Sequence, residues 1–70
     1  MKKRSLTIDG HRTSVSLEDE FWEALHALAR EQGLSLAALA AEIDRTRAGA
    51  NLSSALRLYV LRQLKARIDK

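Results

Sequence analysis

The chain has 70 residues, with 12 lysines and arginines against 9 aspartates and glutamates, and no cysteine. A chain this short holds one domain and buries little of its own surface, so it needs a disulfide, a metal or a partner subunit for stability. The composition excludes disulfides and thiolate metal sites, and two histidines far apart in the sequence do not suggest a metal site. We therefore expect a chain without metal or cofactor that is stabilised by a second copy of itself.

The charge and the hydropathy pattern also indicate where the protein works. Its formal net charge of +3 favours an anionic partner such as nucleic acid. No apolar run is long enough to span a bilayer, and polar residues follow the basic residues 1–4 where a signal peptide would be apolar. We therefore expect an unprocessed cytoplasmic protein that does not enter a membrane.

Residues 5–16, SLTIDGHRTSVS, are rich in β-branched and hydroxyl side chains that alternate with a period of two, which predicts a short β-strand. The alternation gives two faces, one with Thr13, Val15 and Leu17 and the other with Arg12, Ser14 and Ser16. Leu6 and Ile8 alternate in the opposite phase, so the pattern must break at Asp9–Gly10. A hairpin turn and a bulge both satisfy this break.

Three helices are predicted after the strand, over residues 17–32, over residues 36–46 and from residue 52 to near the C-terminus. A candidate capping residue precedes each helix: Ser16, Ser35 and Asn51. Gly33 suits the left-handed position that follows a helix. The third helix is apolar over far more than one stripe, so it needs cover on two sides. A single chain with three helices cannot provide that cover, which favours a dimer.

A single strand must pair with something, because its backbone groups are otherwise exposed along an edge. The simplest partner is the same strand of a second copy, which would form an antiparallel ribbon. We therefore expect a mostly α-helical fold with one short N-terminal β-strand, paired across an intertwined homodimer, and a third C-terminal helix. Residues 1–4 would be a basic flexible tail and residues 5–70 the domain. The predicted dimer core comprises Thr13, Val15, Leu17, Trp22, Leu39, Ile43, Leu56 and Val60.

The order of these elements and two sequence segments resemble a known family. The stretch HRTSVSLEDEFWEALHALAREQGLSLAALAAEID is similar to the ribbon-helix-helix DNA-binding domain, the fold of the Arc and methionine repressors. GHRTSVSLEDEFW followed by NLSSALRLYVL resembles, more narrowly, a bacterial subfamily of short ribbon-helix-helix proteins. The resemblance covers residues 4–65, although a third helix after Asn51 is not part of the minimal fold.

The resemblance implies a sequence-specific DNA-binding protein, a transcriptional regulator, whose two-stranded ribbon enters the major groove of double-stranded DNA. The outward-facing strand residues would then read bases: Arg12, Ser14 and Ser16. The start of the second helix, at Ser35 and Leu36, would hold a phosphate through backbone N–H groups. The basic tail would also contact phosphates: Lys2, Lys3 and Arg4. Two alternatives stay open, because Ser16 can instead cap the first helix and the tail can instead be disordered.

An enzyme and a protein-interaction module are the two other classes of function. An enzyme is not expected, because the chain contains no nucleophile elbow, phosphate-binding loop or dinucleotide fingerprint. The alternative is a dimeric protein-interaction module of antitoxin type, which would bind a partner protein through the third helix. Apolar surface left exposed on that helix would favour the alternative.

Overall fold

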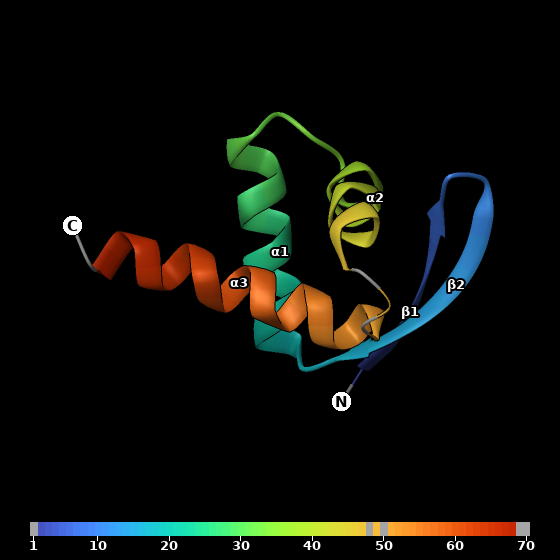
Figure 1. Cartoon of the computed structure of the whole chain (residues 1–70), viewed down its shortest axis with the longest axis horizontal. Helices are drawn as coiled ribbons and strands as arrows, with labels where there is room; N and C mark the ends of the chain where they lie inside the picture. Colours follow the sequence, from blue (N-terminus) through green and yellow to red (C-terminus); the bar gives the residue numbers. More distant parts are fainter. Residues whose placement is uncertain (1, 48, 50, 69–70) are drawn as a thin grey trace.

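The computed structural model describes residues 2–47, 49 and 51–68. Two strands, β1 (Lys2–Ile8) and β2 (His11–Leu17), precede three helices, α1 (Asp19–Glu31), α2 (Leu36–Thr46) and α3 (Leu52–Ile68). The hairpin covers one side of the helices, whereas α3 crosses α1 and its C-terminal half extends beyond it (Figure 1). Within these described residues, no helix combines the length and the apolarity needed to span a membrane.

Strands β1 and β2 form an antiparallel hairpin around the two-residue turn Asp9–Gly10. Both turn residues have positive φ, 51° for Asp9 and 83° for Gly10. A type I′ turn requires this backbone, and its twist matches that of the flanking strands. Ile8 pairs with His11 beside the turn, and the ladder continues to Lys2 opposite Leu17. Of the two predicted solutions at Asp9–Gly10, the hairpin turn is therefore correct.

The predicted single strand is wrong, because β2 pairs with β1 of the same chain. The residues expected in a flexible tail, Lys2, Lys3 and Arg4, lie instead in the first half of β1. Trp22 explains why this charged segment is extended and held in place. Its indole Nε1 donates a hydrogen bond of 3.1 Å to the carbonyl oxygen of Lys2, and the Arg4 guanidinium lies 5.4 Å from the centre of the Trp22 ring.

The core lies where the inner face of the hairpin meets the three helices. Of the residues predicted to form a dimer core, seven are buried inside the single chain: Val15, Leu17, Trp22, Leu39, Ile43, Leu56 and Val60. Thr13 is half-buried. These side chains therefore form the core of one chain, and their contact with a second copy stays a prediction. The inner face of β1 adds Leu6 and Ile8, which explains the opposite phase of these two residues in the sequence.

The helix ends agree with the predicted caps at two of the three positions. The Ser35 hydroxyl accepts a hydrogen bond of 3.1 Å from the Ala38 backbone N–H, and α2 has the predicted bounds. The Asn51 side chain accepts a bond of 3.3 Å from the N–H of Ser54 at the start of α3.

The predicted start of the first helix is wrong by two residues. Helix α1 begins at Asp19, its N-cap is Glu18, and no side chain caps it. Ser16 and Leu17 stay extended because they pair with β1 and because Leu17 is fully buried beneath the helices. Ser16 is therefore a strand residue and not a helix cap. Gly33 follows α1 with a φ of 70°, the left-handed conformation predicted for it.

Candidate nucleic-acid interface

The hairpin presents one face to solvent, which we call the outer face. Cross-strand partners lie on the same side of a sheet, so this face is built from the pairs Lys3–Ser16, Ser5–Ser14 and Thr7–Arg12. Five of these six side chains belong to exposed residues, and Ser16 is half-buried. The outer face thus carries two cations and four hydroxyl groups, and none of its six side chains is a carboxylate.

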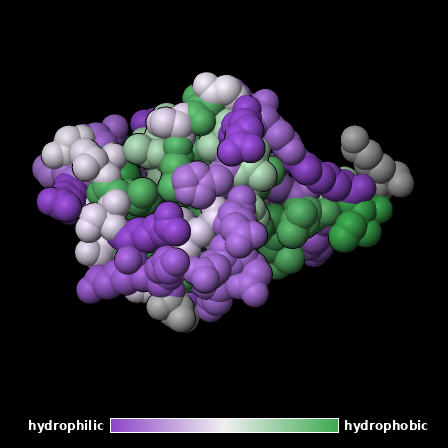
Figure 2. All heavy atoms as spheres, turned by 180° about the vertical axis from the view of Figure 1, so that it is seen from behind, coloured by the Kyte–Doolittle hydropathy of each residue, from purple (hydrophilic) through white to green (hydrophobic). Residues whose placement is uncertain are grey.

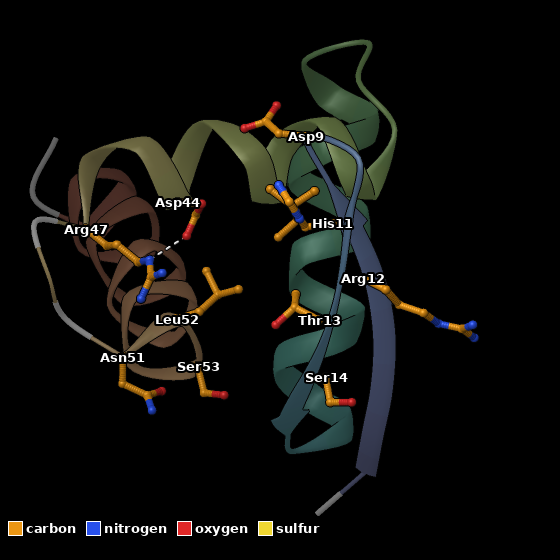
Figure 3. Close-up of a pocket in the computed structure, with 11 residues that line it drawn as sticks. Asp9, His11, Arg12, Thr13, Ser14, Asp44, Arg47, Asn51, Leu52 and Ser53 are labelled. Carbon is orange, nitrogen blue, oxygen red and sulfur yellow. Dashed lines mark hydrogen bonds and ion pairs between the residues drawn. The ribbon is translucent and has the colours of Figure 1, made fainter.

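The orientation of the outer face is fixed by what lies beneath it. On the opposite side of the hairpin, Leu6, Ile8, Val15 and Leu17 are 9%, 5%, 1% and 0% exposed. A slip of one residue in either strand would turn these apolar side chains to solvent and bury polar ones, so the register is strongly determined. Arg12 accordingly points away from the helices (Figure 3), and Ser14 lies on the same face of the hairpin.

These side chains suit the chemistry of a DNA groove. A two-stranded ribbon fits the major groove, where the arginine fork matches the O6 and N7 acceptors of guanine. Serine and threonine hydroxyls can donate to or accept from base edges and can also contact phosphates. Lysine binds phosphate as a point charge. The outer face can therefore provide both base contacts and phosphate contacts.

The basic residues of β1 divide between the two faces of the hairpin. Lys3 lies on the outer face, as the register requires. Arg4 lies on the helix side over Trp22, and the Lys2 ammonium is 3.9 Å from the Asp19 carboxylate. Only Lys3 of these three residues is thus placed to contact a ligand on the outer face.

Two carboxylates close to the hairpin are paired with cations. Asp9, at the turn, lies 3.9 Å from Arg45 of α2. Glu18, which follows β2, accepts a hydrogen bond of 3.1 Å from Arg57 Nε. The pKa of Glu18 is lowered from its ordinary value of 4.5, mainly by a hydrogen bond from its own backbone N–H and then by the bond from Arg57. The charges of Asp9 and Glu18 are therefore compensated, whereas Glu20 lines a hollow together with Lys2 and Lys3.

Ser35 and Leu36 lie at the start of α2, as predicted. The first N–H groups of a helix have no partner within the helix, and the helix dipole adds a partial positive charge there. The Ser35 hydroxyl takes up the N–H of Ala38, so the donors left at this end belong to the residues before it, including Leu36. The arrangement can accept an anion, but a phosphate contact stays a prediction.

A groove of about 510 Å³ runs along the edge of β2 that faces away from β1. Residues 11–14 line one side of it, and Asp44, Arg47 and Leu52 line the other (Figure 3). Asp44 accepts a hydrogen bond from Arg47 Nε at the far wall. Among the described residues the sheet contains two strands, so no further strand occupies this groove.

The backbone of β2 is oriented for pairing on this side. In a hairpin with a two-residue loop, the residues that flank the turn bond to each other, and the bonding direction alternates from there. Arg12, Ser14 and Ser16 therefore direct their N–H and C=O groups away from β1. The C=O of Ser16 accepts a hydrogen bond of 3.4 Å from Arg57 Nη2, in agreement with this direction. β2 thus has an open edge, which another strand can extend.

The described part of the chain offers no group of three or more metal-ligating side chains. His11 and His26 are both exposed. The outer face, the open edge of β2 and the start of α2 are the features relevant to nucleic-acid binding.

The comparisons with known proteins agree with this geometry. A family model described as a ribbon-helix-helix domain matches residues 1–64. The chain belongs to this family. The identification made from the sequence is therefore confirmed. No curated protein matches the chain, and no solved structure matches it.

The family sets the general class of function. Ribbon-helix-helix domains are typically DNA-binding regulators or antitoxins, they typically dimerise, and they are generally non-catalytic. In this ribbon-helix-helix chain the outward positions predicted for Arg12, Ser14 and Ser16 are correct. Sequence reasoning missed Ser5 and Thr7 of β1, although their alternation with Leu6 and Ile8 and the Asp9–Gly10 turn signal were both available.

Proposed function

We propose that this ribbon-helix-helix chain is a sequence-specific DNA-binding protein, a cytoplasmic transcriptional regulator that binds double-stranded DNA as a homodimer. The observation that carries the proposal is the outer face, where two cations and four hydroxyl groups lie together without a carboxylate. The buried inner face fixes its orientation, and its composition suits a groove that presents acceptors and phosphates.

The homodimer would form along the open edge of β2. A second copy's β2 would lie in the adjacent groove and pair antiparallel with the first, giving the strand order β1–β2–β2–β1. This keeps the pairing between copies that the sequence predicted and adds β1 on each side. The family's tendency to dimerise and the outward backbone groups of Arg12 and Ser14 support this arrangement.

In such a four-stranded sheet, the central and the outer strands would contact different parts of the DNA. Strands lie about 4.8 Å apart, so the two outer strands would be about 14 Å apart. The major groove is about 12 Å wide, so the two central β2 strands would enter it and the β1 strands would lie near its rims. Arg12 and Ser14 would then contact base edges, whereas Lys3 would lie near a phosphate.

The other residues predicted to contact DNA lie at the end of β2, at the start of α2 and in β1. Ser16 would contact bases or sugars at the end of β2, and the start of α2 at Ser35 and Leu36 would hold a phosphate. Lys2 and Arg4 would act indirectly, by holding β1 against α1 through Asp19 and Trp22.

The test is selection of bound duplexes from random DNA by the wild-type chain and by Arg12→Ala. The wild-type protein is expected to enrich a motif with twofold symmetry. Arg12→Ala should lose its preference at one position in each half-site, at a cost of about 1–3 kcal/mol. The matched control is Arg62→Ala, which removes the same charge from an exposed position on α3. If Arg12→Ala selects the wild-type motif with wild-type affinity, the outer face does not read DNA.

A second candidate function is the protein-interaction module of antitoxin type. One observation favours it: four large apolar residues of α3 are exposed in the isolated chain, namely Leu58, Leu61, Leu64 and Ile68. These residues are not on the outer face of the hairpin, so the two functions are compatible.

A further inference from the structure

The C-terminal half of α3 carries a continuous apolar stripe. Leu61, Leu64 and Ile68 are 50%, 47% and 79% exposed, and they follow the spacing i, i+3, i+7 that places residues on one side of a helix. Leu58, at 45% exposure, extends the stripe by one turn. Figure 2 shows apolar side chains gathered on the projecting end of the molecule that leads to the C-terminus. Contiguous exposed apolar surface of this kind marks an interaction site.

The stripe cannot turn inward, because the adjoining, core-facing side of α3 is anchored. Leu56 and Val60 are 1% and 2% exposed against the core. Arg67 donates to the Glu31 carboxylate at the end of α1. The Tyr59 hydroxyl accepts a hydrogen bond of 2.7 Å from Gln32 Nε2. These interactions fix the rotation of α3 and leave the stripe in solvent.

The charges along α3 have a single sign. Between residues 52 and 68 the helix has four basic residues and no carboxylate. Arg57 is paired with Glu18, the N-cap of α1, and Arg67 is paired with Glu31 at the end of α1. The other two follow the stripe at i+4 spacing: Arg62 after Leu58 and Lys65 after Leu61. Both are exposed, so positive charge lies directly beside the apolar residues.

We propose that the α3 stripe docks an acidic amphipathic helix of a partner protein, an inference that rests on the second candidate function. Apolar residues of that helix would cover Leu61, Leu64 and Ile68, and its flanking carboxylates would lie opposite Arg62 and Lys65. Complementary charges at the rim of an interface select the partner and steer its approach.

The sequence predicts a second copy as cover for the third helix, but charge decides against a second copy on this stripe. The α3 helix of a second copy would bring the same arginines and lysine and no carboxylate from residues 52–68. Either orientation of two such helices would place like charges beside each other at the rim, which disfavours the pair. The homodimer proposed above uses the open edge of β2, and no residue of the stripe lines the groove beside that edge.

The test uses two synthetic helical peptides and the full chain. The acidic peptide has leucines at i, i+3 and i+7 flanked by glutamates, and the matched peptide has lysines in place of the glutamates. Fluorescence anisotropy is expected to show binding of the acidic peptide and at least about tenfold weaker binding of the lysine peptide. The double variant Leu61→Ser/Leu64→Ser should weaken binding of the acidic peptide by about tenfold or more. Arg62→Glu/Lys65→Glu should reverse the preference between the peptides.

Controls separate this proposal from the DNA-binding function. Ala27→Ser, at an exposed position of α1, should leave peptide binding unchanged. Leu61→Ser/Leu64→Ser should bind DNA like the wild type, so failure of one function does not imply failure of the other. The proposal is overturned if the two peptides bind equally well, or if neither peptide binds. It is also overturned if the double variant alone loses self-association in sedimentation, or if the stripe binds anionic phosphatidylglycerol vesicles and not the acidic peptide.

Discussion

Ser5 and Ser14 are cross-strand partners in the hairpin, and both side chains lie on the outer face. Their backbone N–H groups point toward different edges of the hairpin. The backbone N–H of Ser5 points away from β2, at the outer edge of β1. The backbone N–H of Ser14 points away from β1, into the groove beside β2. The two residues therefore allow the two edges to be tested with the same substitution.

Ser14→Pro is expected to prevent dimerisation. Proline removes the N–H that would pair with the second copy, and an edge strand tolerates it because that N–H takes no part in the β1–β2 ladder. Ser5→Pro makes the same change on the β1 edge and should leave the dimer intact. Sedimentation gives the mass of each variant, and circular dichroism checks that both fold. A dimer that persists in Ser14→Pro would place the interface elsewhere.

Lys3→Ala should weaken binding to all DNA sequences by a similar factor, because phosphate contacts carry no sequence information. The slope of log K against log salt should become shallower by about one for each phosphate that the variant no longer neutralises. Lys2→Ala is the matched control, since Lys2 faces Asp19 on the other side of the same strand. Titrations at several salt concentrations measure both quantities. An identical weakening in the two variants would mean that only net charge matters.

Ser35→Asp should leave the fold nearly unchanged and remove most DNA binding. Aspartate caps a helix about as well as serine, so a change in stability under about 0.5 kcal/mol is expected. Its charge would repel a phosphate at the start of α2. Ala27→Asp adds the same charge at an exposed position of α1 and should not affect binding. A thermal melt and a DNA titration on the same samples decide the outcome, and normal binding by Ser35→Asp would show that α2 does not contact DNA.

The contact between Glu18 and Arg57 predicts a pH dependence of stability. The pKa of Glu18 is lower in the folded chain than its ordinary value of 4.5, so the folded state favours the charged carboxylate. The stabilisation is fully present above this ordinary value and is lost as the pH falls through the folded-state pKa. Glu18→Gln should remove that part of the acid sensitivity, whereas Glu23→Gln, at an exposed position, should retain it. Melting temperatures measured as the pH falls from neutral test this, and parallel curves for wild type and Glu18→Gln would contradict it.

Local signals in the sequence were sufficient for much of the fold. The caps Ser35 and Asn51 and the left-handed Gly33 depend on neighbouring residues, and the structure has each as predicted. The face of β2 that carries Arg12 followed from alternation alone.

The errors arose where tertiary contacts decide the structure. Lys2–Arg4 have no apolar alternation of their own, and they are extended because Trp22, about 20 residues away, binds this segment. Ser16 has the properties of a helix cap, but pairing with Lys3 keeps it in the sheet. Without β1, the contribution of Ser5 and Thr7 to the outer face could not be predicted.

The most direct test of the account is a map of backbone amide shifts by nuclear magnetic resonance as a selected DNA duplex is added to the chain. We expect the largest changes on the two hairpin strands, at Lys3, Thr7, Arg12 and Ser14, with smaller changes at the start of α2. The amides of Leu61 and Leu64 should be unaffected, because the α3 stripe is not part of the outer face. Changes confined to α3, with the hairpin amides unmoved at saturating DNA, would contradict the claim that the outer face of the hairpin binds DNA.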